Sequence, residues 1–115
     1  ALNIIEEQTK SIGNMQNILQ CCSKAQNSQQ DICLYQNAFQ QITQTMFSKM
    51  ENACASNNIN ADFMREMIPH HQGAIQMSQN VLRFDICPEL VPILQAIITS
   101  QREGVNKMER LLRCI

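Results

Sequence analysis

The sequence is poor in histidine, in basic segments and in long apolar runs, and two of these shortages each exclude a class of partner. Nine Lys and Arg residues stand against ten Asp and Glu residues, scattered along a chain of 115 residues. A nucleic-acid or anionic-membrane partner needs a basic patch, which this pattern does not supply. No apolar run reaches the roughly 18 residues needed to cross a bilayer. We therefore expect no nucleic-acid partner and no membrane span.

The spacing of the apolar residues predicts the fold. They recur every three or four positions, and strict alternation nowhere persists, so the chain is expected to be all-α and to form one domain over residues 1–115. Four helices are predicted, over residues 3–26, 31–55, 60–84 and 88–113. Short connections between long helices favour antiparallel neighbours. The simplest arrangement is an antiparallel up-down-up-down four-helix bundle.

Each predicted helix carries an apolar stripe that is expected to face the core of the bundle. Two of these stripes bear on the later argument. The first helix contributes Ile4, Ile5, Ile12, Met15, Ile18, Leu19, Cys22 and Ala25, and the third contributes Phe63, Met67, His70, Ala74, Met77 and Val81.

Six cysteines are many for a chain of this length, and none of them forms a close Cys-x-x-Cys pair of the kind found in zinc sites. This content is typical of a disulfide-braced protein in an oxidising compartment, so a periplasmic or secreted location is expected. The bundle places Cys54 and Cys114 at one end, where we expect them to pair. Cys21, Cys22, Cys33 and Cys87 fall near the other end. We expect Cys21 and Cys22 to divide Cys33 and Cys87 between them.

The two histidines of the chain, His70 and His71, stand side by side after Pro69. His70 falls within the apolar stripe of the third helix and is the predicted inward histidine, whereas His71 lies toward the flank. Met67 precedes His70 by three residues and Met64 precedes His71 by seven, which puts each methionine on the same side as a histidine. Thioether and imidazole together suit Cu(I), or its mimic Ag(I), better than iron.

Other methionines are predicted to reach the same layer of the bundle. At about 1.5 Å per helical residue, Met46, Met50 and Met108 lie within about 15 Å of the end that holds Cys54, as do both histidines. Met77 lies about 24 Å from that end and is the weaker candidate on this ground. Pro69 either bends the third helix beside His70 or opens a new helix at its first turn.

Two other interpretations compete with copper binding. Methionines at core spacing also fill a core without any metal, which would leave a metal-free, disulfide-stabilised helical module that binds another protein. A di-iron oxidase would need Glu-x-x-His pairs, but the residue three before His70 is Met67. No nucleophile and base combination stands out either, so no enzymatic activity is expected.

The second half of the chain resembles the ferritin-like family catalogued as domain of unknown function 305. The residues that carry this resemblance are Asp62, Phe63, Met67 to His71, Gly73 to Ile75, Met77, Pro88 to Leu90, Ile97, Ile98, Gln101, Met108 and Leu112. Phe47 and Gly104 stand where the family pattern has histidine and glutamate. The resemblance implies an exported four-helical protein that sequesters or transfers copper, and it adds Met77 to the ligand set. A delivery partner and a homo-oligomer stay open.

Overall fold

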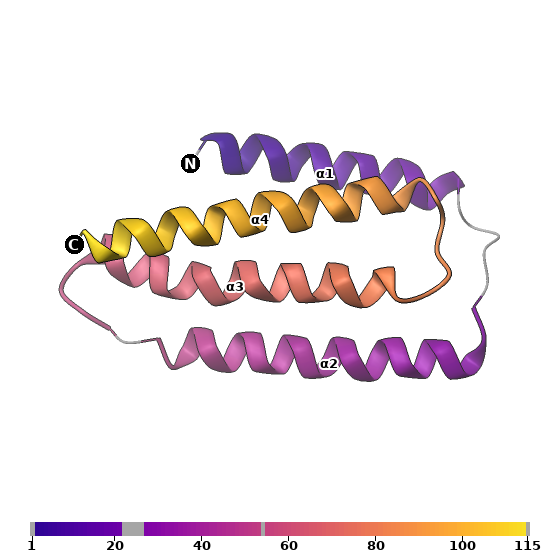
Figure 1. The fold of residues 1–115 in the computed structure, drawn as a ribbon, viewed down its shortest axis with the longest axis horizontal. Helices are drawn as coiled ribbons and strands as arrows, with labels where there is room; N and C mark the ends of the chain where they lie inside the picture. The colour runs from indigo at the N-terminus through magenta and orange to yellow at the C-terminus, as the bar shows by residue number, and fades with distance from the viewer. Residues whose placement is uncertain (1, 22–26, 54, 115) are drawn as a thin grey trace.

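The computed structural model describes residues 2–21, 27–53 and 55–114, with side chains described from Ile4 to Gln20 in the first of these ranges. Within these ranges the chain forms helices and no strand. The helices are α1 (Leu2–Cys21), α2 (Gln29–Glu51), α3 (Ile59–Leu82) and α4 (Leu90–Arg113). Successive helices run in opposite directions, and the start of α1 lies at the same end of the molecule as the end of α4 (Figure 1). The predicted four antiparallel helices are confirmed.

The start of α3 is held by the polar side chains that precede it. The Asn58 side chain accepts hydrogen bonds from the backbone amides of Asn60 and Ala61, which have no partner within the helix. Asp62 accepts from both the amide and the hydroxyl of Ser56, at 2.8 and 2.7 Å. Pro69 lies inside α3, which continues on both sides of it. The alternative in which Pro69 opens a new helix is therefore wrong.

The helices form an open arrangement rather than a closed ring. Among the described residues α3 packs against both α2 and α4, whereas α1 packs against α4 alone. The order across the molecule is thus α2, α3, α4 and α1 (Figure 1). The Cα atoms extend over 50 × 28 × 17 Å. Because the described residues of α1 contact neither α2 nor α3, no other described helix covers the face of α3 between α2 and α4.

This opening changes which residues are buried. The stripe of α1 was predicted to be core, yet Ile5 is 64% and Leu19 is 74% exposed. The predicted stripe of α3 is also not buried, because it points at the gap that α1 leaves. We call this set the open stripe: Phe63, Met67, His70, Ala74, Met77 and Val81. The residues that α3 buries instead are Ala61, Met64, His71, Gly73, Ser78 and Asn80.

The cysteines depart from the predicted pairing. Cys33 and Cys114 are exposed and carry free thiols, so neither the Cys54–Cys114 pair nor a bond to Cys33 is present in this structure. Cys87 is disulfide-bonded to a partner outside the described side chains. Cys22, Cys54 and the side chain of Cys21 also lie outside the part that is described.

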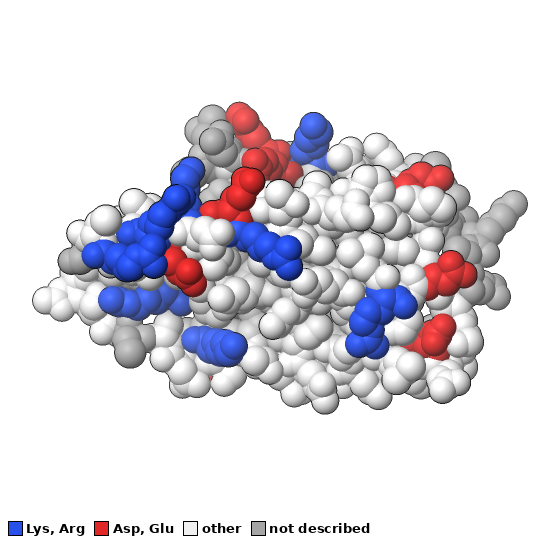
Figure 2. Space-filling model, viewed as in Figure 1, with Lys and Arg blue, Asp and Glu red and all other residues white. Residues whose placement is uncertain are grey.

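Charges of both signs occur on the face seen in Figure 2, and uncharged surface covers most of its middle. Lys and Arg side chains gather toward the left end of that face, with Asp and Glu side chains among them. None of the described helices is long and apolar enough to span a membrane, as expected from the sequence.

Candidate functional site

The side chain of Met46 packs against a glycine of α3, Gly73. Met46 is the one buried residue of α2. A Cβ atom at Gly73 would overlap the Sδ and Cγ atoms of Met46. The absence of a side chain at this position therefore lets the two helices approach with the sulfur between them.

A second glycine makes room for an imidazole. His71 is 6% exposed, and its ring lies against Gly104 of α4. A Cβ atom at Gly104 would stand 3.0 Å from Cδ2 and 3.4 Å from Nε2 of His71. Gly104 is the position at which the sequence departs from the glutamate of the family pattern. With glycine at position 104, the backbone of α4 lies directly against the His71 ring, and this position supplies no carboxylate beside it.

The burial of His71 decides its protonation. Desolvation lowers the pKa of His71, the backbone carbonyl of Met67 opposes this effect, and the neighbouring His70 adds to the lowering. The ring is therefore neutral at pH 7. Its Nδ1 atom is buried and makes no hydrogen bond of ordinary geometry. A buried nitrogen left unpaired is costly, so it calls for an explanation.

The two histidines have exchanged their predicted places. His71 is buried, whereas His70 is half-buried on the open stripe. Their ring centroids lie 6.1 Å apart at an interplanar angle of 62°. The prediction that His70 is the inward histidine is wrong, because α3 buries the sides that face α2 and α4 rather than the stripe between them.

Helix direction places two further sulfur atoms level with each other, one turn or about 6 Å from the level of His71. Since α3 and α4 are antiparallel and His71 lies against Gly104, one turn back along α3 and one turn on along α4 reach the same height. These positions are Met67 and Met108, both half-buried. Met67 is three residues from His70 and four from His71, so it neighbours both on the helix surface. Met67, His70, His71 and Met108 thus form one candidate cluster.

The remaining predicted ligands lie elsewhere. Met46 packs on Gly73, about 200° around α3 from His71, so it faces the opposite side of that helix. Met64 is buried two turns before His71, and Met77 lies on the open stripe about 15 Å along the helix from Met67. Met50 is half-buried on α2. In the described part of the chain, no three His, Cys, Asp or Glu side chains gather closely enough to hold a metal ion.

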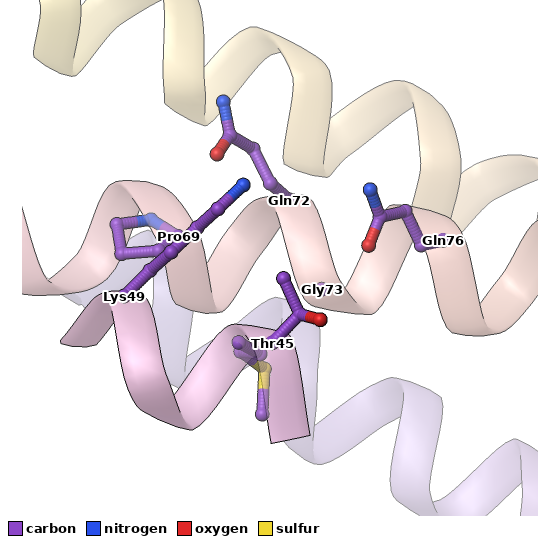
Figure 3. Close-up of a pocket in the computed structure, with 7 residues that line it drawn as sticks. Thr45, Lys49, Pro69, Gln72, Gly73 and Gln76 are labelled. Carbon is purple, nitrogen blue, oxygen red and sulfur yellow. The ribbon is translucent and has the colours of Figure 1, made fainter. Parts of the chain in front are cut away.

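A small pocket opens between α2 and α3 beside Met46, with a volume of about 10 Å³. Lys49 and Thr45 border it from α2, and Pro69 and Gly73 border it from α3 (Figure 3). This volume holds one water-sized guest. It is far too small for an organic substrate.

A larger apolar cavity, of about 310 Å³ and open to the surface, lies near the C-terminal end of α3 and was not predicted from the sequence. Phe84 packs edge-on against Tyr35, with ring centroids 6.2 Å apart. The cavity is lined by Asn27, Asp31, Ile32, Tyr35, Val81, Phe84, Ile86 and Leu90. These residues come from segments about fifty positions apart, so no local pattern could reveal them. The contacts at Gly73 and Gly104 were missed too, although a glycine inside a helix is a signal of close packing.

Comparison with known proteins supports the resemblance seen in the sequence. No curated protein matches the chain. The family described as Domain of unknown function (DUF305) matches residues 1–112, which includes the first helix as well as the His70–His71 stretch. Because this match spans nearly the whole chain, the protein belongs to the DUF305 family.

Proposed function

We propose that this protein binds Cu(I) as cargo outside the cytoplasm, either to sequester it or to hand it on, and that it catalyses no reaction. One observation carries the proposal: the Nδ1 atom of the buried His71 makes no hydrogen bond of ordinary geometry, and helix geometry sets Met67 and Met108 within one turn of this ring. A neutral imidazole is the form that binds a metal.

The chemistry of the donors supports soft copper over harder metals. Imidazole and thioether are ligands suited to Cu(I), whereas iron and manganese in helical bundles are held by carboxylates. Met67, His71 and Met108 are the proposed ligands, with His70 completing the set from the open stripe. Glycine at position 104 leaves this set without a carboxylate, which favours the monovalent ion.

The compartment and the wider fold are part of the same proposal. Six cysteines in 115 residues favour export to an oxidising environment and disulfide bracing there, with Cys87 as the described participant. We further propose that the four helices are a ferritin-like bundle whose site has replaced the usual carboxylates with sulfur.

Anaerobic titration with Cu(I), competed against a chromophoric chelator, tests the proposal. We expect tight binding by the native protein. His71→Ala, Met67→Leu and Met108→Leu should each lower the copper affinity about tenfold or more, because even the loss of a residue that only orients a metal ligand lowers affinity by that much. Met15→Leu changes a methionine on α1 and is the matched control, which should bind as the native protein does. No competition by the native protein, or full affinity in His71→Ala, would overturn the proposal.

The pH dependence of the same titration checks imidazole ligation. Protons compete with the metal for the ring nitrogen, so affinity should fall as pH drops through the histidine range. Constant affinity from pH 8 to pH 5 would argue against a histidine ligand.

The second candidate function is a metal-free module that binds another protein. The exposed apolar stripes of α1 and α3 favour this candidate, since patches of this kind commonly mark interaction sites. In that case a protein with both histidines changed to alanine would differ from the native one in stability alone.

A further inference from the structure

The chain exposes more surface than a compact protein of its mass. Its accessible area is 8388 Å², whereas a monomer of 13.1 kDa is expected to expose about 6,400 Å². The excess of about 2,000 Å² per chain is the area that each subunit of a large obligate homodimer buries. The fold therefore leaves an interface-sized surface uncovered.

The open stripe is where this surface is best suited to a partner. It carries no Asp, Glu, Lys or Arg side chain, and Phe63 at one end is 55% exposed. Val81, at the other end, also lines the apolar cavity beside Tyr35 and Phe84. One end of the stripe thus offers a protruding aromatic ring, and the other end offers an apolar hollow of about 310 Å³.

The spacing of the open stripe makes it complementary to itself. Its positions are symmetric about residue 72: Phe63 and Val81 are each nine residues away, Met67 and Met77 five, and His70 and Ala74 two. When two copies of this stripe pack antiparallel, the Phe63 ring of each copy meets the apolar cavity of the other copy, at both ends of the interface. This is the self-complementarity that a two-fold interface requires.

We propose that a second copy of this chain packs antiparallel across the open stripe, about a two-fold axis level with Gln72, with Phe63 of each copy filling the partner's apolar cavity. The net charge of −1 per chain opposes this association only weakly. A buried aromatic side chain in an apolar pocket is the contact that most often dominates an interface.

In this dimer Met77 would lie close to the other proposed copper ligands, which it does not do within a single chain. Within one helix Met67 and Met77 are about 15 Å apart. Across the two-fold axis Met67 faces the partner subunit's Met77 at the same height, and His70 lies three residues, about 4.5 Å, further along α3. The dimer does not depend on copper, but it would bring these donors together.

Sedimentation equilibrium in buffer that contains a metal chelator tests the dimer apart from metal binding. We expect the native protein at twice the chain mass of 13.1 kDa. Phe63→Ala should weaken association by at least about thirtyfold, as expected for a central aromatic contact. Phe47→Ala is the matched control, because Phe47 is also 55% exposed but lies on α2 outside the open stripe. Circular dichroism checks that both variants stay folded.

Charged substitutions test which residues of the two α3 helices face each other in the dimer. The double variant Met67→Glu, Met77→Glu places like charges opposite each other at both contacts and should be monomeric. Met67→Lys, Met77→Glu places opposite charges there and should dimerise. Equal behaviour of these two variants, a monomeric native protein, or equal dissociation of Phe63→Ala and Phe47→Ala would each overturn the proposal. A failed copper titration would leave it standing.

Discussion

The helices α1 and α3 are both amphipathic and of similar length, 20 and 24 residues, yet the molecule uses them differently. α3 packs between two neighbours and buries residues on two sides, one of which holds His71. In the described part of the chain α1 packs against α4 alone, and most of its described apolar side chains are exposed: Ile4, Ile5, Ile12, Met15 and Leu19. An apolar stripe thus shows that a helix forms, but which neighbour covers the stripe depends on contacts far away in the sequence.

The largest expected contrast between the two helices comes from truncating one methionine on each. Met64 of α3 is 8% exposed and Met15 of α1 is 36% exposed. Met64→Ala should lower the free energy of unfolding by about 2–4 kcal/mol because it leaves a cavity in the interior. Met15→Ala should cost less than about 1 kcal/mol. Urea unfolding of the metal-free protein measures both, and equal losses would show that α1 is packed as tightly as α3.

A glycine on each helix sharpens the comparison, since the same change should have opposite signs. Gly73→Ala forces its methyl group onto Met46 and should destabilise the protein by about 1–2 kcal/mol. Gly13 of α1 has nothing within 4 Å of an added Cβ, so Gly13→Ala should gain up to about 1 kcal/mol from helix propensity. Thermal unfolding of the two variants gives the signs directly. Stabilisation by Gly73→Ala would mean that α2 and α3 are not in close contact.

The smallest expected effect is a pH dependence of stability that belongs to α3. The folded state lowers the pKa of His71 below its ordinary value of 6.5, so the unfolded chain binds this proton more readily. The free energy of unfolding should therefore fall as pH drops through 6.5, and this loss should level off below the pKa of the folded state. His71→Gln removes the group. Chemical unfolding between pH 7.5 and 5.5, with a chelator present, should show a smaller slope for this variant, and an unchanged slope would contradict the burial of His71.

The sequence predicted local features well. The third helix was expected over residues 60–84 and is found at Ile59–Leu82, where the Asn58 side chain caps its start. The inward histidine was predicted wrongly. One residue is a rotation of about 100°, so the choice between His70 and His71 depends on where the neighbouring helices sit. The predicted disulfide pairs rested on which end of the bundle each cysteine lies at, and a shared end did not bring Cys33 or Cys114 into a disulfide bond.

Pro69 gives the proposed site a property that affinity alone does not describe. A proline has no amide hydrogen, so the carbonyl of Arg65 loses its ordinary partner one turn away, in the middle of α3. The turn that carries Met67, His70 and His71 therefore has one backbone hydrogen bond fewer than the other turns of α3. Local opening should be fastest there, while the capped start and the packed flanks of α3 hold firm. A carrier must also let go of its cargo, and a loosened turn at the binding residues would let release be quick even where binding is tight.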